Sequence, residues 1–156
     1  MSDVVVRLAE PRDVPGLVAS SSALFAEDAG TRDPTVNATW PREQGERRFV
    51  EELADPLRLT VVAERDGEIV GHLSGQLTES WSKRPVRVAT LATLHLSPDL
   101  RGGGFGAALT ERFLEWAREQ GAAVAEVSAY AANQGAVRFY ERQGFAVHSV
   151  TLRADL

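Results

Sequence analysis

Arg101 and the closely spaced glycines after it are the residues whose types and spacing point most directly to chemistry. They form the stretch Arg101-Gly102-Gly103-Gly104-Phe105-Gly106. The residues that follow, AALTERFLEWAREQ, favour a helix, so the glycines precede a helix amino terminus whose first N–H groups lack internal partners. Such amides and the positive end of the helix dipole attract anions, phosphate above all, and Arg101 adds a charge-assisted donor. The stretch therefore predicts a phosphate site.

Two familiar phosphate loops do not fit this stretch. A P-loop requires Lys and Ser/Thr after its last glycine, where Ala107 and Ala108 stand. The dinucleotide fingerprint requires Gly or Ala where Leu109 stands. Nucleotide phosphotransfer is disfavoured by the missing Lys-Ser/Thr pair and by the lack of a magnesium-binding carboxylate near the loop. A plain tight turn remains the alternative, although such a turn needs fewer glycines.

The pattern that does fit is R-x-x-G-x-G, formed by Arg101, Gly104 and Gly106 after a strand that ends L-x-P. It resembles the acyl-CoA pyrophosphate loop of the GNAT superfamily of N-acetyltransferases. The stretch from Asn133 to Phe145 resembles the second signature of that family, N-x-x-A-x-x-x-Y-x-x-x-G-F, at every specified position. Taken singly, its asparagine reads as a helix N-cap and its tyrosine as a half-buried helix aromatic. The resemblance covers about residues 57–150, and before them it depends only on the order of elements.

The resemblance implies a role for each matched residue. It assigns the pyrophosphate of acetyl-CoA to Arg101, Gly102, Gly103, Gly104, Phe105 and Gly106, and the pantetheine arm to Asn133 and to the backbone of Leu94, His95 and Leu96. A backbone N–H of this strand would donate to the thioester carbonyl as negative charge builds on it. Tyr140 is implied as the general acid that protonates the departing thiolate, for which a phenol is a reasonable match.

The implied reaction is direct attack of a primary amine on acetyl-CoA in a ternary complex. The sequence has no cysteine that could form an acyl-enzyme. The alternative function is a non-catalytic acyl-CoA-binding or sensing domain with the same fold. An amine-dependent release of CoA would distinguish the enzyme from the binding module.

The elements around the motifs follow from periodicity and turn signals. We predict strands at 4–8, 57–65, 68–77, 86–96, 122–130 and 145–152, and helices at 10–25, 43–53, 105–120 and from about 134 to Gly144. Asp66-Gly67 predicts a hairpin turn, and residues 27–41 and 81–85 read as loops. The helical crossover between residues 96 and 122 makes the strands on either side of it parallel neighbours. The predicted fold class is α/β, a GNAT-like mixed, mainly antiparallel sheet flanked by helices, with a parallel pair splayed around the acyl-CoA site.

Length and composition limit the number of domains and the kinds of partner that the sequence predicts. The 156 residues, with 44% apolar and 25% charged residues, predict one soluble domain over residues 1–156. A net charge of −5 argues against nucleic-acid and membrane-surface partners. The three histidines lack a metal-ligand spacing, so we expect no metal. No signal peptide or spanning segment is evident, which predicts a cytoplasmic protein, and the family leaves a homodimer open.

The general base stays open at this point. The strand before the loop offers only Ala, Thr and Leu over residues 89–93. His95, Glu126 and Glu79 are the titratable groups nearest to the motifs. A packed or exposed histidine and solvated glutamates are the simpler interpretations, so none of the three is assigned.

The acceptor amine also stays open, among a protein N-terminus, a polyamine, an aminoglycoside-like compound and an amino acid. Glu27, Asp28 and Asp33 offer negative charge for a cationic acceptor in the loop after the first helix, with Trp40 and Trp81 as walls. A solvated loop is an equal alternative. Lys83, Arg84 and Arg87 mark an exposed hairpin end or a contact for an acidic partner or the 3′-phosphate of CoA.

Overall fold

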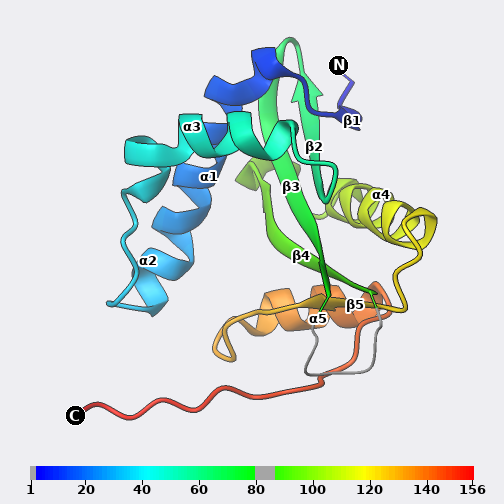
Figure 1. Cartoon of the computed structure of the whole chain (residues 1–156). Helices are drawn as coiled ribbons and strands as arrows, with labels where there is room; N and C mark the ends of the chain where they lie inside the picture. Colours follow the sequence, from blue (N-terminus) through cyan, green and yellow to red (C-terminus); the bar gives the residue numbers. More distant parts are fainter. Residues whose placement is uncertain (1–2, 80–86) are drawn as a thin grey trace.

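A five-stranded sheet organises the computed structural model, which describes residues 3–79 and 87–156 (Figure 1). The strands are β1 (Val5–Leu8), β2 (Arg58–Arg65), β3 (Glu68–Glu79), β4 (Arg87–Leu96) and β5 (Val124–Val127). They lie in the order β1-β2-β3-β4-β5, and every neighbouring pair is antiparallel except β4 and β5, which are parallel. The predicted mixed sheet with one parallel pair is therefore confirmed.

Helices cover both faces of this sheet. They are the 3-10 turn η1 (Pro11–Asp13), α1 (Val14–Glu27), α2 (Ala29–Arg32), α3 (Trp40–Leu53), the 3-10 turn η2 (Pro98–Leu100), α4 (Phe105–Glu119) and α5 (Gln134–Arg142). Figure 1 shows α1 and α3 on one face and α4 on the other. No helix in the described ranges has the length and hydrophobicity that crossing a bilayer would require.

The sequence predicts loops at residues 27–41 and 81–85. The one at residues 27–41 is shorter than expected, because it contains α2 and because α3 begins at Trp40. Pro41 lies in the first turn of α3, where its fixed φ suits a helix start, so the helix begins before the predicted Glu43. The loop at 81–85, with Trp81, Lys83 and Arg84, lies outside the described residues.

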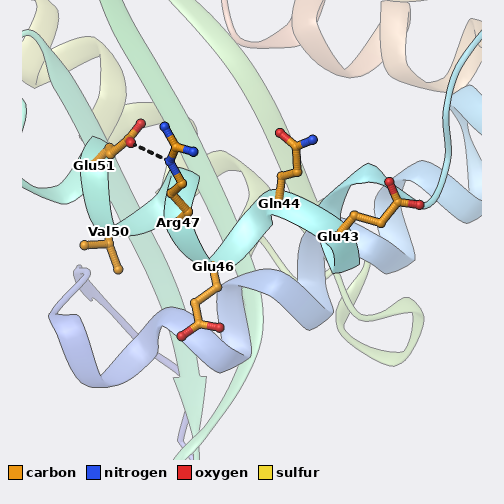
Figure 2. Close-up of a pocket in the computed structure, with 6 residues that line it drawn as sticks. All are labelled: Glu43, Gln44, Glu46, Arg47, Val50 and Glu51. Carbon is orange, nitrogen blue, oxygen red and sulfur yellow. Dashed lines mark hydrogen bonds and ion pairs between the residues drawn. The ribbon is translucent and has the colours of Figure 1, made fainter.

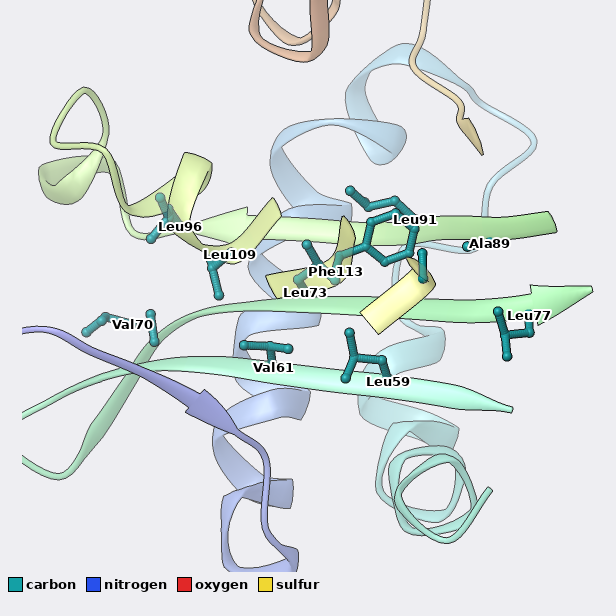
Figure 3. Packing of buried hydrophobic residues seen from close by; sticks show 12 residues of the cluster. Leu59, Val61, Val70, Leu73, Leu77, Ala89, Leu91, Leu96, Leu109 and Phe113 are labelled. Atoms are coloured by element: carbon teal, nitrogen blue, oxygen red, sulfur yellow. The ribbon is translucent and has the colours of Figure 1, made fainter. Parts of the chain in front are cut away.

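Two apolar cores fix the positions of the helices. The larger lies between the sheet and α4, where Leu109 and Phe113 pack against Leu73 and its neighbours (Figure 3). The smaller lies on the other face, where Leu17 of α1 and Phe49 of α3 pack against β2. Because both faces of β2 and β3 are covered, a side chain in the middle of either strand is buried whichever way it points.

The ladder around β4 changes at Ala92. Pairing with β3 joins Thr93 to Ser74 and Leu91 to Gly75, which leaves Ala92 as an extra, bulged residue. Pairing with β5 runs only from Val88 to Leu91. A bulge bends its strand and ends local pairing, so β4 continues beyond Ala92 without a ladder partner on its β5 edge, within the described residues. The predicted splay of the parallel pair has its structural origin here.

The predicted closing strand at residues 145–152 is wrong. In the described chain, residues 145–156 form neither helix nor strand, and Val147, Val150 and Leu152 are largely exposed. Alternating apolar residues meet only one requirement of a strand, since a strand also needs a partner edge. The segment instead runs out to the chain end below α2 in Figure 1, and Arg153 Nη1 donates to Asp33 Oδ1 at 2.7 Å.

Candidate active site

The glycine turn connects β4 and η2 to α4. Gly102 and Gly104 have φ values of 85° and 87°, a left-handed conformation that glycine adopts without strain. Gly104 is the N-cap of α4, and no side chain of the described residues caps this helix. A Cβ placed on either glycine would meet nothing within 4 Å. The turn therefore presents free helix amides beside open space, an arrangement suited to phosphate oxygens.

Gly106 has a different role from the other glycines. It lies in the first turn of α4, where a Cβ would come within 3.2 Å of Phe139 Cε1 in α5. The absence of a side chain lets these two helices touch. Gly106 thus joins the two signature stretches by packing, whereas the open side of the turn is formed at Gly102 and Gly104.

The Arg101 side chain turns toward β4 and α1. Its Nε and Nη2 donate to the carbonyl oxygen of Leu96 at 3.1 and 2.9 Å, and Nη2 also donates to the Glu27 carboxylate. Arg101 therefore lies over the end of the unpaired β4 edge, and its guanidinium must rotate to reach an anion in the glycine turn.

The backbone groups of Leu94 and Leu96 face this unpaired edge. Ser97 N donates to Val70 O of β3, and the polar backbone groups of a strand alternate between its two sides. The carbonyl oxygen of His95 also faces β3, since it lies 2.7 Å from a Cβ placed on Gly71. Of the three residues predicted to pair with a pantetheine arm, Leu94 and Leu96 can do so, whereas the His95 backbone belongs to the β3 ladder.

Asn133 and Tyr140 come from the second signature stretch, at the start and within α5. Asn133 Oδ1 accepts from Ala136 N at 3.2 Å, which makes it the N-cap, and its Nδ2 donates to Asp28 Oδ1 at 3.2 Å. The half-buried Tyr140 ring packs edge-on between Phe139 and Phe145. Burial, and secondarily the charge of Asp28, raises the pKa of Tyr140 to about 12. The phenol therefore keeps its proton at neutral pH, as a general acid must.

The carboxyl end of α1 contacts both signature stretches. Glu27 pairs with Arg101 of the first, and Asp28 accepts from Asn133 of the second. Asp33, the third acidic residue singled out from the sequence, is instead paired with Arg153. The Trp40 ring packs edge-on against Phe25 of α1 at 5.5 Å between ring centroids, which places it beside this acidic end.

A buried polar cluster lies directly behind Glu27. Ser20 Oγ of α1 lies 2.6 Å from His72 Nδ1 of β3 and 3.1 Å from His95 Nδ1 of β4. His95 Nε2 lies 3.6 Å from the Glu27 carboxylate. Burial, followed by the nearby His95, lowers the pKa of His72 to about 3. Burial is also the main cause that lowers the pKa of His95, against the opposing effect of Glu27.

His95 is one of the three possible bases that the sequence offers, but its link to Ser20 and His72 is not predicted from the sequence. No motif has this spacing, because the three residues come from three different elements. One signal was available: a histidine in the middle of a strand covered on both faces must be buried, and a buried imidazole needs polar partners.

The other two bases named from the sequence lie elsewhere. Glu79 pairs with Arg87 at 3.2 Å, where β3 ends and β4 begins, at the opposite end of β4 from the glycine turn. Arg87 also donates to Gln120 O at 2.8 Å, so it lies away from the glycine turn as well. Glu126 is exposed on β5. His95 is therefore the one of the three that borders the glycine turn and the acidic end of α1.

A shallow hollow on the outer side of α3 is a separate feature. Figure 2 shows that a single helix lines it, with the residues Glu43, Gln44, Glu46, Arg47, Val50 and Glu51. None of these is a residue that the sequence placed in the site. Across residues 3–79 and 87–156, no group of three or more His, Cys, Asp or Glu side chains is arranged to hold a metal ion.

Comparison with solved structures supports the same fold. A mutant of the BH1408 protein from Bacillus halodurans matches with a TM-score of 0.87, 17% identity, and coverage of 97% of this chain and 99% of that one. Aminoglycoside N-acetyltransferase AAC(6')-Iy, solved in complex with CoA, matches with a TM-score of 0.78 and 13% identity over 100% of this chain and 96% of that one. At these identities the likeness concerns the fold alone.

Sequence comparison adds the family. A mycothiol acetyltransferase from Streptomyces griseus subsp. griseus is 33% identical over 152 residues, which make up 96% of this chain and 45% of that protein. This chain thus spans less than half the length of that relative. The model of the acetyltransferase (GNAT) family matches residues 24–145, a segment that contains both signature stretches and the acidic end of α1. The chain belongs to the GNAT acetyltransferase family.

Proposed function

We propose that this protein is an N-acetyltransferase that moves the acetyl group of acetyl-CoA to a primary amine. The observation that carries the proposal is the edge of β4 beyond Ala92, which has no described ladder partner on its β5 side and leads directly into an open glycine turn. An extended pantetheine arm can bond to such an edge as an added strand does, while the turn takes the pyrophosphate.

The residues present fit acetyl-CoA as a substrate. The amides of the first turn of α4 and the polar backbone groups of Leu94 and Leu96 supply hydrogen-bond donors and acceptors. Arg101 supplies a cation once it rotates away from Leu96 O. One N–H on the β4 edge would donate to the thioester oxygen as the amine attacks, which stabilises the developing negative charge.

Tyr140 is proposed to donate a proton to the departing thiolate. Its hydroxyl is protonated at neutral pH, because burial raises its pKa to about 12. Asn133 is the N-cap of the same helix, so α5 positions both residues. When acetyl-CoA binds, the Asn133 amide would donate to a carbonyl of the pantetheine arm in place of Asp28. The amide would thus keep a hydrogen-bond acceptor.

The acceptor is proposed to be a cationic amine held at the carboxyl end of α1. Glu27 and Asp28 supply the negative charge there, and they lie beside the two stretches proposed to hold acetyl-CoA. A mycothiol-related amine belongs among the acceptors to be tested, because the Streptomyces relative carries that name.

Incubation of the purified protein with acetyl-CoA, a thiol reagent and a panel of amines tests the proposal. The panel contains an amino acid, a polyamine, an aminoglycoside, a peptide N-terminus and a mycothiol-related amine. An enzyme releases free CoA faster when one of these amines is present. Binding of CoA without amine-dependent release would favour the alternative, a non-catalytic acyl-CoA-sensing domain.

We also propose that two copies associate through the exposed segment 145–156. Its apolar side chains Val147, Val150 and Leu152 are exposed, and Val124 of β5 is exposed as well. Burial of these groups would be favourable by about 25 cal/mol per Å² of apolar surface. Sedimentation of the full chain tests this: a dimer that Val150→Asp converts to a monomer supports it, and a monomer at all concentrations refutes it.

A further inference from the structure

We propose that His95 takes the proton from the ammonium group of the acceptor. His95 then passes its other ring proton to Ser20, and Ser20 passes its hydroxyl proton to His72, so that neither imidazole stays charged. This proposal rests on the proposed function, because it concerns the acceptor of the same reaction. A lysine-like amine is neutral in only about one molecule in 2,500 near pH 7, so the reaction needs a group that removes its proton. The proposal gives that task to His95, and Ser20 and His72 are positioning residues.

Five side chains form one continuous polar line. It begins at the partly exposed Glu27, 3.6 Å from His95 Nε2, and continues from His95 Nδ1 to Ser20 Oγ at 3.1 Å. Ser20 Oγ lies 2.6 Å from His72 Nδ1. At the far end, His72 Nε2 lies 3.3 Å from the hydroxyl of the half-buried Thr93. Both ring nitrogens of both histidines thus have a polar neighbour.

The hydrogen atoms of this line have two consistent arrangements. Ser20 has one hydroxyl proton, so it donates to one imidazole and accepts from the other. In the first arrangement His95 carries its proton on Nε2 and donates toward Glu27. In the second His95 carries its proton on Nδ1, and its bare Nε2 can accept. The carboxylate alone favours the first, whereas an ammonium group lying between Glu27 and His95 favours the second.

The proton transfer is balanced within the line. An N–H bond of the ammonium breaks and an Nε2–H bond forms on His95, while the Nδ1 proton of His95 passes to Ser20 Oγ. The Ser20 hydroxyl proton passes to His72 Nδ1, and the Nε2 proton of His72 leaves through the Thr93 hydroxyl to solvent. Every group of the line is neutral before and after the transfer, apart from the Glu27 carboxylate.

Neutrality matters because His72 is fully buried. Burial lowers its pKa to about 3, so an imidazolium at this position would be costly and a relay by exchange of tautomers avoids one. The charged groups that face His95 are Glu27 of α1 and Arg101, and His72 of β3 is the further titratable group. Burial lowers the pKa of His95 as well, which leaves it free to accept a proton at neutral pH.

Nitrogen-15 NMR of the imidazoles tests the arrangement without any substrate. The sequence has only three histidines, so single variants assign every signal. We expect His72 and His95 each to show one protonated and one bare nitrogen near pH 7, and Ser20→Ala to change both sets of signals. Ser22→Ala is the matched control on the same helix, because the Ser22 hydroxyl has no hydrogen-bond partner among the residues that the structure describes. Unchanged histidine signals in Ser20→Ala would overturn the relay.

Kinetics with two acceptors test the proton transfer itself. His95→Gln should lower kcat by about 10²-fold or more with an amine that is an ammonium at neutral pH. The loss should become much smaller with hydroxylamine, which is already neutral there. Ser20→Ala should show the same pattern to a smaller extent, whereas Ser22→Ala should match the parent protein. An equal loss with both acceptors would assign His95 a structural role only and overturn the proposal. Absence of any amine-dependent CoA release in the parent protein would refute the proposed function instead.

Discussion

Glu27 and Arg101 are 74 residues apart in the sequence and form an ion pair between the end of α1 and the glycine turn. Arg101 belongs to the stretch proposed to hold the pyrophosphate, and Glu27 to the end proposed to hold the acceptor. Rotation of Arg101 toward an anion would leave the Glu27 carboxylate free beside His95. This one contact would couple the two proposed binding steps, in the order CoA first and amine second.

The first prediction concerns this coupling. Glu27→Gln should strengthen CoA binding by about 1.5- to 5-fold, because a partly exposed ion pair of this kind contributes roughly 0.2–1 kcal/mol and no longer competes for Arg101. The KM for the amine should rise in the same variant. Calorimetry with CoA and steady-state kinetics measure the two effects.

Glu46→Gln is the matched control for that variant, since it removes the same charge from the exposed outer side of α3. It should change neither CoA affinity nor the KM for the amine. Weaker CoA binding in Glu27→Gln would contradict the coupling.

The second prediction separates two glycines. Gly104→Ala puts a Cβ on a residue with a φ of 87°, which should lower the free energy of unfolding by about 1–2 kcal/mol. Gly104→Val should in addition weaken CoA binding, because its side chain extends into the open space of the turn. Gly106→Ala should disturb the contact between α4 and α5 at Phe139. Chemical unfolding and calorimetry measure both quantities, and full CoA affinity in Gly104→Val would remove the phosphate assignment.

The third prediction concerns the general acid. Tyr140→Phe should lower kcat by about 10²-fold or more and leave the affinity for CoA nearly unchanged, because only the hydroxyl is lost and the ring packing with Phe139 and Phe145 stays. Single-turnover kinetics give the rate of the chemical step. Full activity of the variant would mean that the thiolate leaves without a proton from this residue.

The signature stretches could be predicted from the sequence because their properties are local. The helix start at the glycine turn, the Asp66-Gly67 hairpin and the parallel pair around a helical crossover all depend on neighbouring residues. The cluster of Ser20, His72 and His95 could not be predicted in this way, since the packing of α1 on β3 and β4 brings its members together. The direction of the Arg101 side chain likewise depends on Glu27.

The error at the carboxyl end has a related cause. Residues 145–152 have the alternation of a strand, and the prediction treated that alternation as sufficient. Ladder formation depends on a second edge, and the described chain leaves this segment exposed beyond α5. The alternation of apolar residues within one segment does not show whether a neighbouring strand has an unpaired edge to which the segment could bond.

The fourth prediction concerns stability in mild acid. The folded-state pKa of His72 is about 3, below its usual value, and that of His95 is also lowered. As the pH falls below about 6.5, the unfolded chain binds protons that the folded chain excludes, so the free energy of unfolding should fall by up to about 1.4 kcal/mol per pH unit for each group. Urea unfolding between about pH 7.5 and 5 measures the slope.

His72→Leu should flatten that slope. His95→Gln should flatten it in part, and it provides the test if His72→Leu folds poorly. The Arg7 guanidinium lowers the pKa of Asp13, so the stabilisation from this carboxylate is lost only at more acidic pH. It does not affect the slope between about pH 7.5 and 5. A slope that is the same in the parent protein and in both variants would contradict the buried, neutral state of the two histidines.

Titration calorimetry of the purified protein with CoA tests the central claim most directly, namely that the turn at Gly104 and the open β4 edge bind this substrate. The account predicts saturable binding with a dissociation constant in about the micromolar to millimolar range of substrate affinities, and a clear loss of that binding in Gly104→Val. No heat of association with the parent protein at millimolar CoA would contradict it.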